Sequence, residues 1–252
     1  MTTPEFPDLL TLIDERSRAL AVAAATAADD APVPGCPDWT VRDLVGHVGE
    51  VQRFWAAIVA AGPPDGPTPG PAAGMESPIP DGDLTAWYAE STGLLRAALE
   101  AAGPDAGCWT WWAASPAPAT AGAVARHQVQ EAAVHARDAQ EAAHRAEPIP
   151  AGIALDGVAE FLVAGFGSCG AWPDKPARVA IQADEGGGWV VDLTDAGAAV
   201  VDGAAGPAPD VSLRGPASDL LLALYGRRSL DALGVDGDRA VVERLLAWPP
   251  FG

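Results

Sequence analysis

The sequence predicts an α+β protein in which a four-helix bundle is followed by a small α+β domain. In residues 1–147, apolar side chains recur in four segments with a helical period of about 3.6 residues. In residues 151–252, short apolar and β-branched runs alternate with Gly, Asp and Pro, which is typical of strands joined by turns. The run Glu-Pro-Ile-Pro at 147–150 separates the two patterns. We therefore expect two domains, at 1–147 and 151–252, joined by this linker.

Each N-terminal segment combines a helical period with a boundary signal. Thr40 can cap the second helix, and Asp43 places a negative charge in its first turn, where the helix dipole favours one. Residues 62–83 are dense in proline and glycine, so we expect a long loop there. The four expected helices cover residues 7–28, 40–61, 83–102 and 120–145.

The C-terminal domain is expected to contain strands first and helices around them. Pro216 suits the first turn of a helix that continues through a leucine-rich run. The expected strands cover residues 177–183, 188–194, 198–202 and 211–214. The expected helices cover residues 153–164, a segment from 216, and 238–248.

Composition excludes several classes of function. The formal net charge of −19 argues against binding to nucleic acid or to anionic membrane surfaces. The three cysteines share no CxxC spacing, which argues against a disulfide framework or a cysteine zinc site. We find no signal peptide and no apolar run long enough to cross a membrane, so we expect a cytoplasmic protein. A monomer is favoured because two domains already provide an internal cleft.

Four polar side chains share one face of the fourth predicted helix. His127, Glu131, His135 and Asp138 are spaced three or four residues apart, and no proline or glycine interrupts residues 126–140. Imidazole and carboxylate groups one turn apart can bind one divalent metal ion. A solvated polar helix face is the alternative interpretation of this spacing.

A third donor comes from the second predicted helix. His47 lies on or beside its apolar face, where a hydrogen-bonded core histidine is the alternative interpretation. With Glu131 and His135 it completes a site of three protein ligands, which leaves positions open as in catalytic zinc sites. Zinc suits two histidines and a carboxylate, although iron, nickel or cobalt would also bind such a set.

Two other motifs are less informative. Residues 165–170 match GxGxxG, but a helix is expected before them, so a flexible loop is favoured over a nucleotide site. Trp109, Trp111 and Trp112 fit either the wall of a pocket or the closed end of a bundle. Serine-nucleophile chemistry is not expected, because the sequence has no GxSxG motif and no histidine after His144.

Three stretches together resemble the mycothiol-dependent maleylpyruvate isomerase family. They are Pro-Asp-Trp-Thr-Val-Arg-Asp-Leu-Val-Gly-His at 37–47, the pattern Arg-x4-Glu-x3-His-x2-Asp at 126–138, and Val-Ser-Leu-Arg-Gly-Pro-Ala-Ser-Asp-Leu at 211–220. The resemblance covers nearly the whole chain. It implies a DinB-like four-helix bundle with a C-terminal domain similar to sterol-carrier-like folds.

The resemblance also implies a metal site and a thiol cosubstrate. The matching residues His47, Glu131 and His135 would hold a divalent metal, usually zinc, with mycothiol as the cosubstrate. We expect an isomerase or S-transferase that activates the thiol as a metal-bound thiolate for attack on a small electrophile. His127 departs from the pattern of close relatives, which leaves open whether it is a fourth ligand.

The catalytic residues and the reaction are less well specified. Asp138 is a candidate for orienting a metal ligand or for helix packing. Arg214 and Arg227 are candidates for pairing with an anionic substrate, although an ordinary surface arginine is the favoured interpretation of each. Two other functions use the same ligands: a non-catalytic module that binds a metal or small molecule, and a metal-dependent hydrolase.

Overall fold

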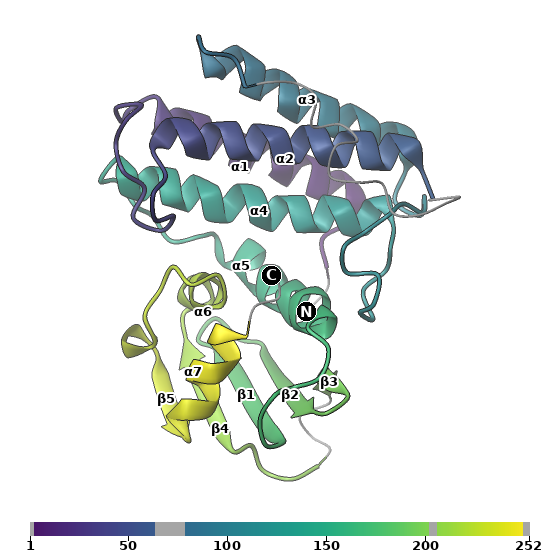
Figure 1. Ribbon diagram of the computed structural model, residues 1–252, viewed down its shortest axis with the longest axis vertical. Helices are drawn as coiled ribbons and strands as arrows, with labels where there is room; N and C mark the ends of the chain where they lie inside the picture. The colour runs from purple at the N-terminus through teal and green to yellow at the C-terminus, as the bar shows by residue number, and fades with distance from the viewer. Residues whose placement is uncertain (1–2, 64–78, 202–205, 249–252) are drawn as a thin grey trace. The chain divides into compact units, whose positions relative to one another are not determined.

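The computed structural model describes residues 3–63, 79–201 and 206–248 (Figure 1). The chain forms two compact units. One comprises Pro4–Thr110 with Pro118–Ile149, and the other comprises Met1–Thr3, Trp111–Ala117 and Pro150–Gly252. The first is helical and the second contains a sheet with helices, which confirms the predicted α+β class. The predicted boundary between domains stays a prediction.

The helical unit contains four long helices that lie side by side in Figure 1. All four predicted helices are present, with ends that differ from expectation by at most a few residues. Of the expected loop at 62–83, residues 64–78 lie outside the described part of the chain. The helices are α1 (Phe6–Ala24), α2 (Val41–Ala61), α3 (Leu84–Ala102) and α4 (Ala121–Ala142).

The start of α2 is fixed by a reciprocal cap. The Asp43 backbone N–H donates to Thr40 Oγ1 at 3.2 Å, and the Thr40 backbone N–H donates to Asp43 Oδ2 at 2.8 Å. Two N–H groups that the first turn would otherwise leave without partners are therefore satisfied. This confirms the predicted start of the helix that carries His47.

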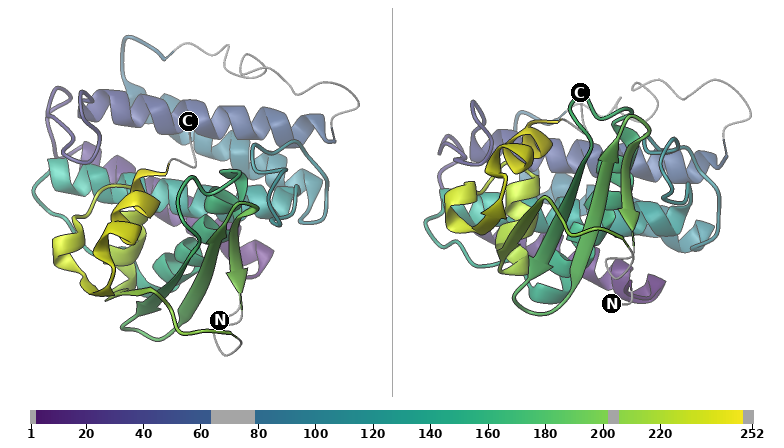
Figure 2. Two further views of the ribbon diagram at one scale, coloured as in Figure 1. Left: turned by 60° about the horizontal axis from the view of Figure 1, so that its bottom comes forward. Right: turned by 90° about the horizontal axis from the view of Figure 1, so that it is seen from below.

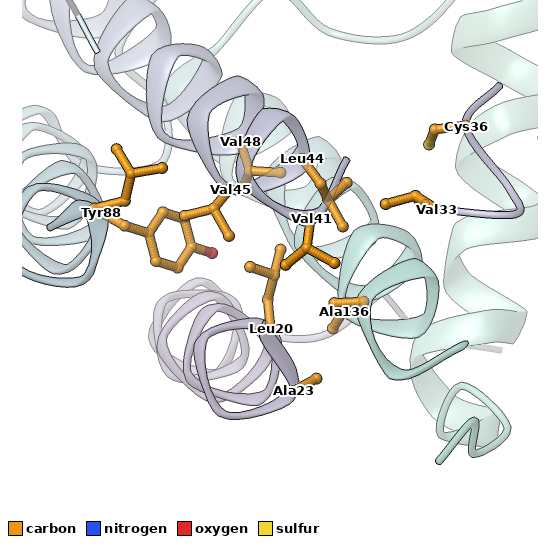
Figure 3. Close-up of a cluster of buried hydrophobic side chains, with 12 residues drawn as sticks. Leu20, Ala23, Val33, Cys36, Val41, Leu44, Val45, Val48, Tyr88 and Ala136 are labelled. Carbon is orange, nitrogen blue, oxygen red and sulfur yellow. The ribbon is translucent and has the colours of Figure 1, made fainter. Parts of the chain in front are cut away.

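The core of the helical unit draws on all four helices and on the segment before α2 (Figure 3). A close approach of α2 and α3 is possible because position 49 is glycine: a Cβ there would lie 2.2 Å from the Trp87 ring. Apolar burial of this kind is the main favourable term in folding. The cluster includes Leu20, Val33, Val41, Leu44, Val45, Val48, Tyr88 and Ala136.

The second unit contains a five-stranded sheet with the order β3-β2-β1-β4-β5. The pairing is antiparallel except between β1 and β4, which run parallel. Buried residues alternate along β1 and β4, as expected for strands with one face in a core. The strands are β1 (Ala177–Ala183), β2 (Gly188–Thr194), β3 (Gly197–Val201), β4 (Val211–Gly215) and β5 (Gly234–Gly237).

Helices α6 (Ala217–Leu224) and α7 (Arg239–Ala247) both contact β4 within this unit (Figure 2). The backbone N–H groups at the start of α6 are partly satisfied by Glu185, which accepts a 2.8 Å hydrogen bond from Ala217 N–H. The four predicted strands and the helix after Pro216 are confirmed. Strand β5 was not predicted, because Gly-Val-Asp-Gly shows no alternating apolar pattern.

Helix α5 (Ala151–Glu160) continues into a π-helical turn at Phe161–Gly165 and a 3-10 turn at Phe166–Ser168. The glycine motif at 165–170 therefore follows a helix, as expected, and lacks the strand that a dinucleotide site requires. Residues 151–168 also reach the length and hydropathy of a membrane span, contrary to our expectation that no run would do so. Most of this stretch is buried, and the core helix of a soluble protein meets the same criteria.

Candidate functional site

One face of α4 carries four polar residues and points into the interior of the helical unit. We call this face the polar stripe; it consists of His127, Glu131, His135 and Asp138. His127, His135 and Asp138 are buried, and Glu131 is only 15% exposed at its side chain. The stripe is therefore not a solvated helix face. Burial of several ionisable groups on one helix is costly unless each finds a partner, so their partners define the site.

Three of the predicted donors converge. Glu131 Oε1 lies 3.4 Å from His47 Nε2 and 3.3 Å from His135 Nε2. Helix α2 supplies His47, and α4 supplies the other two residues one turn apart. One donor atom from each of the three lies within 4.8 Å of the others. The structure thus brings together residues that are more than 80 positions apart in the sequence, as the metal-site hypothesis requires.

The distances from Glu131 Oε1 to the two histidine nitrogens fit a shared divalent metal ion. Nitrogen and oxygen ligands about 2.0–2.2 Å from a zinc ion at tetrahedral angles lie about 3.4 Å from one another. Two neutral imidazoles and one carboxylate form the ligand set of several catalytic zinc sites, which keep a further position for water or substrate. The residues present therefore fit the metal that the resemblance implies.

The three donor side chains differ in their exposure to solvent, which decreases from His47 to Glu131 to His135. The side chain of His47 is 36% exposed, that of Glu131 is 15% exposed and that of His135 is 7% exposed. An incoming molecule can therefore reach the cluster from the side of His47, whereas His135 forms its buried wall.

A buried carboxylate orients His135 from behind. His135 Nδ1 lies 2.9 Å from Asp138 Oδ2, and the same oxygen accepts a 3.5 Å hydrogen bond from the Cys36 thiol. An imidazole that donates from Nδ1 keeps the lone pair of Nε2 available for a metal. Of the two roles considered for Asp138, the geometry favours orientation of a ligand.

Sequence reasoning missed two neighbours of the cluster, Cys36 and Trp39. The Trp39 ring centroid lies 4.7 Å from that of His47 and 6.2 Å from that of His135, with which it is stacked. Both residues precede α2, in a segment that folds back through the bridge between Pro32 and Thr40. The turn-rich sequence indicated a loop but carried no signal of where the loop would lie.

Charge interactions shift the protonation of the cluster. Burial alone would raise the pKa of Glu131, but the charge of His135 and hydrogen bonds from His135 and His47 hold that pKa well below its usual value. Burial likewise opposes protonation of His135, but Glu131, Asp138 and Cys36 raise its pKa well above its usual value. A metal ion would therefore have to displace a proton from His135.

The other candidate residues lie in different surroundings. His127 is buried with its ring centroid 6.2 Å from that of Trp55, and it is not a member of the three-donor cluster. Arg214 lies on β4 in the other unit, where its Nε is 3.0 Å from Asp184 Oδ1 in an exposed ion pair. Arg227 donates to the Tyr225 carbonyl at 2.7 Å.

The tryptophan cluster is divided between the two units. Trp109 stacks on Trp55 in the helical unit, with ring centroids 6.0 Å apart. Trp111 and Trp112 belong to the other unit and contact each other edge to face. Trp112 is buried, so it does not form an open pocket wall.

Both parts of the chain match models of known protein families. Residues 10–140 match the family model described as the mycothiol maleylpyruvate isomerase N-terminal domain, and residues 152–244 match the MDMPI C-terminal domain. No curated protein sequence matches the chain at a significant level.

Two similar solved structures cover almost all of the chain. One is the crystal structure of a mycothiol-dependent maleylpyruvate isomerase, with a TM-score of 0.59 and 14% identity, covering 94% of this chain and 96% of the other. The second is a histidine-to-alanine mutant of such an enzyme, with a TM-score of 0.60, 14% identity and the same coverage. At this identity the similarity establishes the fold, and the two family matches establish the relationship: the chain belongs to the mycothiol maleylpyruvate isomerase family.

Proposed function

We propose that the protein is a divalent-metal- and mycothiol-dependent isomerase that acts on maleylpyruvate or a related small electrophile. The observation that carries this proposal is the convergence of His47, Glu131 and His135 within the segment that matches the family's N-terminal domain. Zinc is the metal that the donor set favours. The proposed location is the cytoplasm, and the proposed partners are a small-molecule thiol and its electrophile.

A divalent ion bound by these residues would lower the pKa of an arriving thiol, so that the thiol is present as thiolate at neutral pH. The ligand set carries one negative charge, because Glu131 is ionised and both histidines bind as neutral imidazoles. A divalent ion held by this set would retain one positive charge, which would favour an anionic thiolate over a neutral thiol. Asp138 keeps His135 in the tautomer that binds from Nε2.

The thiolate is the nucleophile that cis–trans isomerisation of an activated alkene requires. Its sulfur adds to one carbon of the double bond, the remaining carbon–carbon single bond rotates, and expulsion of the thiolate restores the double bond in the trans geometry. The thiol is regenerated, so it is consumed only if the adduct leaves the site. Release of the adduct would instead make the protein an S-transferase.

The direct test is turnover of maleylpyruvate by the zinc-loaded protein with and without mycothiol, together with a His47→Ala, His135→Ala double variant. We expect isomerisation that depends on mycothiol and falls to background in the double variant. Thiol-dependent turnover that survives in the double variant would contradict the proposal. Metal binding without turnover of any thiol adduct would favour a binding module, and hydrolysis that thiol inhibits would favour a hydrolase.

A further inference from the structure

A second concave site lies in the helical unit, in the groove between α1 and the end of α4. It is a hollow of about 450 Å³, within the range of small-molecule sites. Its lining contains none of the three metal-site donors. Gln140, which lines it, follows Glu131 by nine residues, and at about 100° per residue the two project from opposite faces of α4.

Three arginines line this hollow: Arg16 and Arg18 on α1, and Arg145 after α4. Within residues 3–63, 79–201 and 206–248, their side chains form no hydrogen bond or ion pair, and Arg16 Nε is buried. Several other arginines of the described chain are paired with carboxylates, as in Arg53–Glu90 and Arg178–Asp192. In a chain of net charge −19, three arginines without a carboxylate partner in one hollow are unexpected.

The backbone holds Arg145 at this position. His144 adopts a positive φ of 56°, its N–H donates to the Glu141 carbonyl at 2.9 Å, and the Arg145 N–H donates to the Gln140 carbonyl at 2.8 Å. These two bonds form a Schellman motif, which fixes the direction of the chain as it leaves a helix. Arg145 therefore starts from an ordered backbone, which lowers the entropy cost of binding through its side chain.

The rest of the lining restricts the ligand. Val22 is 60% exposed, the largest exposure among the large hydrophobic residues of the described chain, and it offers an apolar floor with Ala19. Glu15 and Glu147 also line the hollow, so the three arginines and two glutamates give its lining a net charge of +1. This balance suits a small anion of low charge and disfavours a polyanion.

We propose that this hollow, which we call the arginine pocket, binds a small anion that carries a phosphate or carboxylate group on an apolar body. The planar guanidinium groups of Arg16, Arg18 and Arg145 suit bidentate hydrogen bonds to such oxygens. The apolar body lies on Val22 and Ala19. The arginine pocket is separate from the metal cluster and binds its ligand without the metal.

Calorimetric titration of the metal-stripped protein with phenyl phosphate tests this proposal, with benzoate, inorganic phosphate and benzyl alcohol as companion probes. We expect submillimolar binding of phenyl phosphate or benzoate that weakens with salt, and much weaker binding of benzyl alcohol. Comparison of phenyl phosphate with benzoate identifies the preferred anionic group. Val22→Ser should weaken binding of phenyl phosphate but leave that of inorganic phosphate unchanged.

Matched variants locate the binding. Arg16→Gln and Arg145→Gln should each weaken phenyl phosphate about tenfold, the loss of one charge-assisted contact. Arg239→Gln makes the same change of charge at an exposed, ion-paired arginine of the other unit and should have no effect. Three results would overturn the proposal: no binding of either aromatic anion at millimolar concentration, equal weakening by Arg145→Gln and Arg239→Gln, or loss of binding in His47→Ala.

Discussion

Helices α4 and α6 are both deeply buried, but they bury different chemistry. Helix α4 buries imidazole, carboxamide and carboxylate groups, whereas α6 buries four leucines, two alanines and one serine. Buried ionisable groups stabilise a fold poorly, because desolvation offsets most of the attraction between them. This difference indicates that α6 contributes to the stability of its unit, whereas the polar stripe of α4 forms a functional site.

The largest effect on activity is expected from removing the negative charge of Glu131 in the metal cluster. Glu131→Gln keeps the shape of the side chain and removes its charge, so thiol-dependent kcat/KM should fall at least about a hundredfold. Glu141→Gln is the matched control on the same helix, since Glu141 pairs with Arg137 on the surface. Equal activity of the two variants would show that the charge of Glu131 has no role.

A substitution in α6 should instead affect stability and leave the metal site intact. Leu220→Ala leaves a cavity in a fully buried position and should lower the free energy of unfolding by about 2–5 kcal/mol. Leu94→Ala, at an exposed position of α3, should cost less than about 0.5 kcal/mol. Urea denaturation followed by circular dichroism measures both. If the Leu220→Ala protein is as stable as the Leu94→Ala protein, α6 does not have the stabilising role that we assign to it. We expect the zinc affinity of Leu220→Ala to equal that of the wild type.

The group behind the cluster gives a smaller effect. Asp138→Asn removes the carboxylate that orients His135, so zinc affinity should fall about 10- to 100-fold while the fold is kept. A competition titration with a zinc chelator measures the affinity. If Asp138→Asn binds zinc as tightly as the wild type, the carboxylate is a packing group and not an orienting one.

The shifted pKa values of His135 and Glu131 make the stability of the helical unit depend on pH. The pKa of His135 is raised in the folded chain, so its protonated form contributes stability that is complete below the unfolded pKa and is lost as pH rises through the folded pKa. The lowered pKa of Glu131 contributes stability above its unfolded pKa, and this is lost as pH falls through the folded pKa.

Zinc competes with the proton on His135, so zinc affinity should rise with pH, by up to about tenfold per pH unit, until the folded pKa is passed. Chelator titrations between about pH 5 and 9 test the slope. A zinc affinity that does not change over this range would contradict protonation of His135 in the metal-free protein.

The parts of the site that follow helical spacing could be predicted from the sequence, and the parts that depend on loop paths could not. Glu131 and His135 share a face because of local geometry, and His47 is positioned by a helix whose cap at Thr40 is readable. Cys36 and Trp39 reach the cluster only through tertiary packing, for which no local pattern exists. Strand β5 likewise forms because β4 offers an edge for pairing, despite its two glycines.

The metal site formed by His47, Glu131 and His135 is tested most directly by zinc stoichiometry. The purified wild type, His47→Ala and His144→Ala proteins are each incubated with zinc and dialysed, and their zinc content is measured. His47 belongs to the cluster, whereas His144 is an exposed histidine outside it. We expect about one zinc per chain in the wild type and in His144→Ala, and a site lost or weakened at least about a hundredfold in His47→Ala. A wild-type chain that takes up no zinc or other divalent ion, or equal zinc in all three proteins, would contradict the account.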